Sequence, residues 1–214
     1  SAPARGSPSN GRAHGPRVEY IAVTSTHSGS YPCERQPWAM TGETGGDEVV
    51  VFGDVHGNLA ALEAVWADVD ERGLTDERYC LGDLVGYGTF PNEVCEFVRA
   101  REVPTIVGNY DEGVGENGDD CGCAYQTEAE RARGDRSIAW TNEEITAENR
   151  SFLRGLRDGI DLELGDLAVA LVHGSPRRVN EYLYEDRPDA SLERLLDLAE
   201  ADVLVCGHTH LPYH

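Results

Sequence analysis

The sequence contains no lysine, so arginine supplies all 18 of its basic residues. Aspartate and glutamate together number 39, and the formal net charge is −21. This excess argues against nucleic-acid binding through a general basic patch, because such binding needs cations that neutralise phosphates. It equally argues against attachment to an anionic membrane surface. The simplest interpretation is a solvated, self-repelling surface, and the lack of lysine also suggests a high-salt cytoplasm.

Long apolar runs are missing as well. No stretch approaches the roughly 18 apolar residues of a membrane span, and the first residues lack the apolar core of a signal peptide. The six cysteines are even in number, but nothing else suggests export. Cys80 and Cys206 fall in expected core strands and Cys95 in an expected helix, where small buried thiols are common. We therefore expect a reducing, cytoplasmic setting.

Methionine occurs once, at Met40, and the chain begins with serine. Residues 1–46 hold five of the ten prolines and are rich in glycine and serine. Residues 18–24 have the character of a short strand, but nothing nearby continues it. The sequence therefore predicts a disordered head over residues 1–46, one folded domain over residues 47–214, and a native start at Met40.

The domain begins with the apolar run at residues 49–52, which is typical of a buried strand. It ends in Gly-Asp-Val-His-Gly-Asn at residues 53–58. Asp54 and His56 thus lie two residues apart with glycines on both sides, where the backbone can turn sharply and a ligand can come close. A carboxylate and an imidazole in this setting are half of a divalent metal site.

The same design, a strand followed by glycine and a metal-capable side chain, recurs four times. The strand runs are residues 78–81, 104–107, 167–172 and 202–206, and the motifs are Gly82-Asp83, Gly108-Asn109, His173-Gly174 and Gly207-His208-Thr209-His210. Ligands bind at the carboxyl ends of strands in open α/β sheets, so five such ends can share one crevice. The candidate metal ligands are Asp54, His56, Asp83, Asn109, His173, His208 and His210. A single histidine more often has a structural role, but four at strand ends beside glycines favour metal binding.

Helical periodicity and turn residues place the remaining elements. We expect helices over residues 59–73, 91–101, 127–140, 146–156 and 189–200, a loop over residues 111–126, and a hairpin of strands 159–164 and 167–172. Asp54, Asp83 and Asn109 follow one another at intervals of 29 and 26 residues, which suits βαβ units.

The ordered set GDVHGN, GDLVG, GNYD, HG and GHTH resembles the calcineurin-like metallophosphoesterases over about residues 47–210. The resemblance implies an α/β fold in which two sheets form a β-sandwich flanked by helices. Because such domains usually continue with further strands, it also implies a chain truncated at its C-terminus. The implied reaction is hydrolysis of a phosphoester by two divalent metal ions, with a metal-bridging hydroxide attacking in line.

The resemblance also assigns roles. Asp54, His56 and His210 would hold one metal, Asn109, His173 and His208 the other, and Asp83 would bridge them. Asp111 would orient a ligand or the leaving group, and its alternative is a turn or cap carboxylate. The expected catalytic group is Asp83, Asn109, Tyr110 and Asp111. Mn²⁺ is the expected metal, with Fe²⁺, Ni²⁺ or Zn²⁺ as alternatives.

Tyr110 stands where the family often carries histidine. A tyrosine has a pKa of about 10 and protonates a leaving group poorly. The substitution therefore favours a phosphodiesterase acting on small phosphoesters with good leaving groups. Phosphomonoesterase, protein serine/threonine phosphatase and dinucleoside polyphosphatase activities are the alternatives, and Tyr110 itself could simply pack over the mouth of the site.

Three further features are left open. Arg177 and Arg178 follow a metal ligand closely and are candidate contacts for substrate phosphate, with a plain surface pair as the alternative. Cys121 and Cys123 could bind a separate metal, form a redox pair, or belong to a loop over the site. Finally, a fold of this kind can also serve as a non-catalytic interaction module, and the sequence leaves the oligomeric state undetermined.

Overall fold

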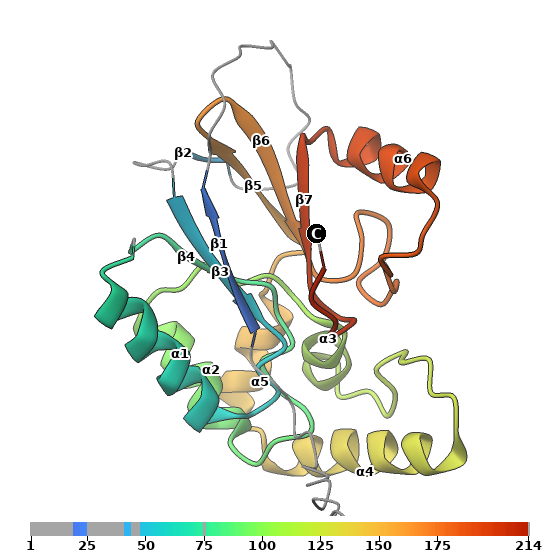
Figure 1. The fold of residues 1–214 in the computed structure, drawn as a ribbon. Coiled ribbons are helices and arrows are strands. Elements are labelled where there is room, and N and C mark those ends of the chain that lie inside the picture. The colour runs from blue at the N-terminus through green and yellow to red at the C-terminus, as the bar shows by residue number, and fades with distance from the viewer. Residues whose placement is uncertain (1–18, 25–40, 44–47, 75, 214) are drawn as a thin grey trace, which may run out of the picture.

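The computed structural model describes residues 19–24, 41–43, 48–74 and 76–213, in which two sheets are flanked by helices (Figure 1). The first sheet has the order β1-β3-β4, from β1 (Glu19–Thr24), β3 (Glu48–Gly53) and β4 (Arg78–Cys80). The second has the order β2-β5-β6-β7, from β2 (Thr41–Glu43), β5 (Gly159–Leu164), β6 (Leu167–Val172) and β7 (Val203–Cys206). The helices are α1 (Leu59–Arg72), α2 (Pro91–Ala100), α3 (Asn109–Gly115), α4 (Glu128–Glu144), α5 (Ala147–Arg154) and α6 (Asp189–Ala199). The predicted α/β class with two sheets is confirmed.

Strand β3 separates two apolar cores, because its side chains point alternately to opposite faces. Val49 and Val51 pack with residues of the second sheet, among them Ile160 and Leu171. Phe52, on the other face, packs in the cluster formed with helical residues. The two sheets therefore pack on each other, and α1 and α2 cover the outer face of the first (Figure 1).

Two pairs of parallel strands bring the predicted motifs together. β3 pairs with β4 and β6 pairs with β7, each in parallel, while β5 and β6 form the expected antiparallel hairpin. The motifs that follow β3, β4, β6 and β7 therefore begin at strand ends of the same direction within each sheet.

The expected strand over residues 104–107 is not a regular strand. This segment makes isolated bridges instead, one between Thr105 and Cys80 and one between Ile106 and Arg157. The segment still runs parallel to β4 at Cys80, so Asn109 reaches the same edge as Asp83.

The expected loop over residues 111–126 begins later than predicted, because α3 occupies residues 109–115. Two glycines within α3 weakened the helical pattern in the sequence. The Asp111 carboxylate stabilises the start of this helix by accepting a hydrogen bond from the backbone N–H of Gly108 at 3.1 Å.

The head at residues 1–46, predicted to be disordered, contains strands β1 and β2. β1 pairs antiparallel with β3, and β2 pairs parallel with β5. They supply hydrogen-bond partners for the backbones of β3 and β5, each of which would otherwise be an edge strand of its sheet. The other residues of the head, Met40 included, lie outside the described residues, and the boundary at residue 47 stays a prediction.

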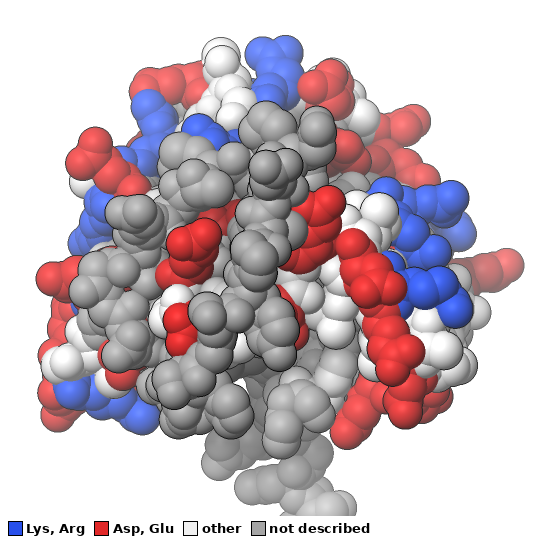
Figure 2. Space-filling model, turned by 90° about the horizontal axis from the view of Figure 1, so that it is seen from above, with Lys and Arg blue, Asp and Glu red and all other residues white. Residues whose placement is uncertain are grey.

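Within the described part of the chain, no helix is both long enough and apolar enough to cross a bilayer. On the face seen in Figure 2, the described arginine side chains lie among acidic ones and do not form a continuous basic surface.

Candidate metal centre

The candidate ligands lie on turns with an unusual backbone conformation. Asp54, His56 and Asp83 have φ angles of 51°, 48° and 50°, and His208 and His210 have φ angles of 66° and 55°. Residues other than glycine rarely adopt a positive φ. Such backbone conformations persist where the surrounding structure enforces them. Five of the seven predicted ligands are thus held in strained turns at the ends of strands.

Two glycines allow the turns to approach one another. A Cβ atom added at Gly108 would lie 2.1 Å from the Asp83 Oδ1 atom. One added at Gly207 would lie 2.6 Å from the Asp54 Oδ2 atom. Both distances are too short for any side chain, so the glycines beside Asn109 and His208 are required for the ligands to converge.

The first group of ligands consists of Asp54, His56 and His210, whose ligand atoms all lie within 4.8 Å of one another. The Nε2 atom of His210 lies 3.1 Å from His56 Nε2 and 3.2 Å from Asp54 Oδ1. Asp54 also accepts a hydrogen bond from the backbone N–H of His208, which links β3 to the loop after β7.

The second group consists of Asp83, His173 and His208, which meet the same limit of 4.8 Å. Asn109 belongs to this group by geometry, because its Oδ1 atom lies 3.1 Å from His173 Nε2. All four side chains are buried. The structure therefore brings all seven predicted ligands together.

Asp83 lies between the two groups. Its Oδ2 atom is 3.4 Å from His56 Nε2 in the first group and 3.4 Å from His173 Nε2 in the second. Its Oδ1 atom accepts a hydrogen bond from the backbone N–H of Tyr110 at 2.8 Å, which fixes the carboxylate. This is the position that a bridging ligand requires.

Two histidines have their tautomers fixed by carbonyl groups. His56 Nδ1 donates to the carbonyl of Val85 at 2.9 Å, and His173 Nδ1 donates to that of Leu81 at 2.7 Å. In the neutral ring, each Nε2 atom then carries a lone pair and points toward Asp83. In this tautomer, a metal cation between the nitrogen atoms and the carboxylate would be bound by all of them.

His208 gives a second reason to place a cation here. Its Nε2 atom is buried and, among the described residues, has no hydrogen-bond partner. A buried polar atom without a partner is costly, and a metal ion would satisfy it. The mixed nitrogen and oxygen donors also suit a divalent transition metal, so the residues present fit the predicted group.

The charges of the site perturb its ionisable groups strongly. Burial alone would lower the pKa of His173, but the nearby Asp83 carboxylate outweighs it and raises that pKa to about 9. Burial and the charge of His173 lower the pKa of His208 to about 4. Burial would raise the pKa of Asp83, yet His173 and His56 hold it below its usual range. Asp83 thus stays negatively charged, as a metal ligand must.

A cavity of about 320 Å³ opens over the ligands. Besides His56, Asp83, Asn109, His208 and His210, it is lined by Tyr87, Tyr110, Cys123, Tyr125, Glu130, Arg133, Tyr182 and Thr209. The sequence analysis had not assigned a site role to Arg133, Glu130, Tyr125 or Tyr182. Both Arg133, which is exposed, and Glu130, which is partly exposed, come from α4, where the sequence shows only a charged helix face.

Tyr110 and Asp111 are both buried but have different surroundings. The Tyr110 hydroxyl lies 3.0 Å from the Tyr125 hydroxyl at the cavity, and burial followed by this contact raises the pKa of Tyr110. Asp111 does not line the cavity, and its carboxylate accepts backbone hydrogen bonds from Leu84 and Gly108. This placement favours the alternative of a cap carboxylate, which ties the Asp83 turn to α3.

Asn109 is held from the loop that follows α3. Its Nδ2 group donates to the carbonyl of Cys121 at 2.9 Å and to the Sγ atom of Cys123 at 3.2 Å. These two contacts decide which end of the amide carries the oxygen toward His173, so the loop orients a predicted metal ligand.

Arg177 and Arg178 do not line the ligand cavity. They line a separate cavity of about 610 Å³ whose wall includes Ser175 and His173. Arg177 also pairs with Glu181. Neither arginine lines the cavity over the other metal ligands, and their role in substrate binding stays a prediction.

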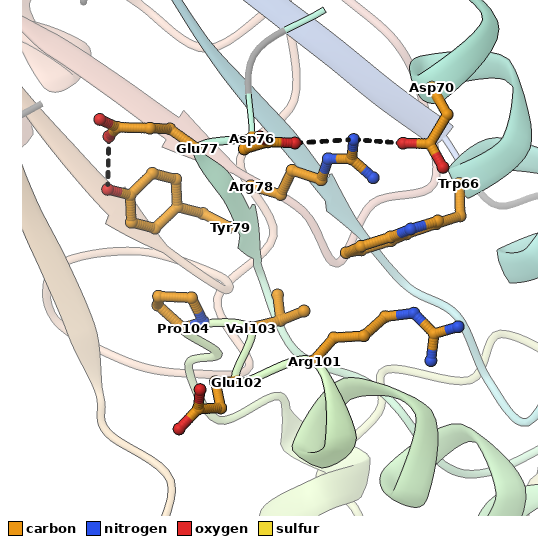
Figure 3. A pocket seen from close by; sticks show the side chains of 10 residues that line it. All are labelled: Trp66, Asp70, Asp76, Glu77, Arg78, Tyr79, Arg101, Glu102, Val103 and Pro104. Carbon is orange, nitrogen blue, oxygen red and sulfur yellow. Dashed lines mark hydrogen bonds and ion pairs between the residues drawn. The ribbon is translucent and has the colours of Figure 1, made fainter. Parts of the chain in front are cut away.

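A third cavity, of about 410 Å³, lies between the end of α1 and the start of β4 and contains no predicted site residue (Figure 3). In Figure 3 the Arg78 guanidinium lies between Asp70 and Asp76, with which it forms ion pairs. It also lies 4.2 Å from the centroid of the Trp66 ring. These contacts pair the charges of Arg78, Asp70 and Asp76 with one another.

The two-sheet fold and the paired ligand groups define a metallophosphoesterase domain. The chain belongs to the calcineurin-like phosphoesterase superfamily, whose domain description matches residues 48–214. The resemblance found in the motifs is thereby confirmed, and the family implies divalent metal ions.

Particular relatives agree with this membership. An uncharacterized protein of Methanocaldococcus jannaschii is 34% identical over 168 residues, which are 77% of this chain and 63% of that protein. A metallophosphoesterase from Sphaerobacter thermophilus has a crystal structure that is similar with a TM-score of 0.56 and 34% identity, over 76% of this chain and 60% of that one. A hypothetical protein from Pyrococcus horikoshii shares the fold, with a TM-score of 0.59 and 24% identity over 74% of this chain and 68% of that one. The chain thus spans less than two thirds of the length of the M. jannaschii and S. thermophilus proteins.

Proposed function

We propose that this chain hydrolyses a phosphoester at a centre of two divalent metal ions, with Mn²⁺ as the expected metal. The observation that carries the proposal is the position of the Asp83 carboxylate, 3.4 Å from one histidine of each ligand group. Asp54, His56 and His210 would hold one ion, and Asn109, His173 and His208 the other. When bound, such ions would polarise the phosphoryl group and lower the pKa of a bound water, which makes that water a better nucleophile.

The protein's own residues would position the substrate in the cavity above the ligands. Arg133 offers a cation to a phosphoryl oxygen in an otherwise acidic chain. The tyrosine rings at the cavity wall, Tyr87 and Tyr182, offer apolar surface to the group that the phosphate esterifies. A small phosphoester substrate suits a cavity of this size.

We further propose that the preferred substrate is a phosphodiester with a good leaving group. Tyr110 cannot readily give up its proton, because burial and the hydroxyl of Tyr125 raise its pKa. A leaving group of high pKa would then depart without protonation, which is slow. Phosphomonoesterase, protein serine/threonine phosphatase and dinucleoside polyphosphatase activities remain the alternatives.

The first test measures turnover of an aryl phosphodiester with added Mn²⁺. We expect activity that EDTA abolishes and that Asp83→Asn lowers by at least about 100-fold, because one oxygen and the bridging charge are lost. Asp197→Asn, on the exposed side of α6, is the matched control and should keep full activity. Activity that survives both EDTA and Asp83→Asn would contradict the proposal, and metal binding without any turnover would favour an interaction module.

The second test compares a series of aryl phosphodiesters whose leaving groups differ in pKa. Because no residue is placed to protonate the leaving group easily, we expect kcat/KM to fall steeply as the pKa of the leaving phenol rises. A rate independent of leaving-group pKa, with chemistry shown to limit turnover, would contradict the assignment to Tyr110.

A further inference from the structure

We propose that Cys121 and Cys123 form a site of reversible oxidation that controls the metal ligand Asn109. Their Sγ atoms lie 3.0 Å apart in the loop between α3 and α4, and both cysteines are free thiols. Cys123 is also the acceptor that helps to orient the Asn109 side chain. A change in the covalent state of this pair therefore acts directly on the metal centre.

The loop holds the two thiols in place. Gly122 between them has a φ of 69°, and a Cβ atom at this position would lie 2.4 Å from Asn180 Nδ2. The backbone N–H of Gly122 donates to Asp120, and Asn180 donates to the Gly122 carbonyl. The tight turn that brings two cysteines separated by a single glycine into contact is thus already formed.

The two cysteines differ in access. Cys123 is partly exposed and lines the cavity over the metal ligands, whereas Cys121 is buried, with 6% of its surface exposed. A small oxidant such as hydrogen peroxide can therefore reach the pair from the cavity through Cys123. The contact between the two sulfurs lowers the pKa of Cys121 and raises that of Cys123, which favours a thiolate at Cys121. Whichever sulfur is oxidised first, the other lies in position to react with it.

The chemistry balances with one peroxide as the two-electron oxidant. One of the two sulfurs attacks one peroxide oxygen and the O–O bond breaks, which gives a sulfenic acid on that sulfur and one water. The other sulfur then attacks the oxidised one, the S–O bond breaks, and the thiol proton leaves with the hydroxyl as a second water. The product is a disulfide between residues 121 and 123, and an external dithiol reverses the reaction.

Oxidation would loosen Asn109. A disulfide sulfur is a weaker hydrogen-bond acceptor than a thiol sulfur, and closing the S–S bond draws Cys123 Sγ toward Cys121. The amide of Asn109 would then keep the Cys121 carbonyl and lose its second partner. Loss of a contact that orients a metal ligand typically weakens metal binding by about 10- to 100-fold, so we expect about tenfold weaker binding of one ion.

The first experiment detects the disulfide without measuring activity. Trypsin cleaves after arginine and releases residues 102–131, a peptide whose only cysteines are Cys121 and Cys123. After native protein is treated with peroxide and then iodoacetamide, mass spectrometry should find this peptide unalkylated and lighter by two hydrogens. Dithiothreitol before alkylation should restore two alkyl groups. A peptide alkylated at both cysteines, while added glutathione in the same sample is oxidised, would overturn the proposal.

Single variants test that both sulfurs are needed. In Cys121→Ser and in Cys123→Ser no resolving thiol remains, so dimedone should trap a sulfenic acid on the remaining cysteine in at least one of the two variants. Circular dichroism checks that each variant is folded. A loss of two hydrogens from this peptide in either variant, or the absence of a dimedone adduct in both, would overturn the proposal.

The second experiment titrates Mn²⁺ into reduced and oxidised protein by calorimetry, and this part rests on the proposed metal centre. We expect the weaker binding described above in the oxidised protein and recovery with dithiothreitol. Cys206→Ser, which leaves the pair intact, should show the same difference. Equal affinities in the two states would overturn the link to Asn109. Failure of the proposed hydrolysis would instead appear as missing turnover, with the disulfide assay unaffected.

Discussion

Single residues at the mouth of the site decide how a substrate is held. Arg133 is the arginine among the residues that line the ligand cavity. Its positive charge does not depend on the protonation of a histidine. It is exposed and reaches the cavity from α4, which lies far along the chain from the strand motifs. A cation at this position complements the charge of a phosphoester without taking part in metal binding.

We expect Arg133→Ala to raise KM for the aryl phosphodiester by about 3- to 10-fold with a smaller change in kcat, because an exposed charge-assisted contact is of modest strength. Steady-state kinetics in Mn²⁺ separate the two constants. Arg136→Ala is the matched control, since Arg136 lies on the same helix and does not line the cavity. An equal effect in both variants would point to overall charge and would contradict a specific contact.

At the scale of elements, the segment between β6 and α6 is held by one carboxylate. Glu181 accepts a hydrogen bond from the Ser175 hydroxyl and pairs with Arg177 and Arg187. This cluster lies shortly after His173 in the chain, and it pairs Arg177 with Glu181. The segment therefore helps to position the end of β6, where His173 lies. Its Glu181 carboxylate also forms ion pairs with Arg177 and Arg187.

The Glu181 cluster predicts a pH dependence of stability. Burial would raise the pKa of Glu181, but Arg177, Ser175 and Arg187 outweigh it and lower the pKa to about 2. Because the pKa in the folded state lies below the unfolded value of about 4.3, the stabilisation is fully present above that value and is lost as pH falls toward 2. Glu181→Gln should lower the free energy of unfolding by about 2 kcal/mol at pH 7, with the difference shrinking below about pH 4. Urea unfolding of metal-free protein at several pH values measures this, and a difference independent of pH would contradict it.

At the scale of the whole molecule, negative charge is abundant both outside and inside. The formal charge is −21, and two of the carboxylates counted in it, Asp54 and Asp83, lie among the histidines of the metal centre. Bound cations would offset this local repulsion and satisfy the buried His208 Nε2 atom. Because they would bind the folded chain and not the unfolded one, they should stabilise the fold.

We therefore expect added Mn²⁺ to raise the thermal unfolding temperature, with about 2.7 kcal/mol of stabilisation for an ion at 100 times its dissociation constant. Differential scanning fluorimetry with Mn²⁺ and then excess EDTA measures the effect. Asp83→Asn should lose most of it, whereas Asp197→Asn should keep it. Stabilisation of equal size in Asp83→Asn would mean that Mn²⁺ binds elsewhere on the acidic surface.

Most of the ligand set could be predicted from the sequence because each part is local. An apolar strand followed by Gly-Asp or Gly-His is a short-range pattern, and parallel strands bring such ends to one edge whatever the loops do. The same local logic predicted α1, α2, α4, α5 and α6. It failed for α3, whose glycines hid the helix, and for residues 104–107, where apolar character did not lead to a regular strand.

Sequence by itself thus determined the family, the two-sheet class and the residues able to hold metal. Tertiary structure alone decided which other side chains surround them, because that depends on the paths of loops and helices between the strands. Arg177 is four residues from His173 yet lines another cavity, whereas Arg133 is distant in sequence and lines the site. Cys123 likewise meets Asn109 through the return of a loop. Short-range patterns encode strand ends, and only packing brings separate segments into contact.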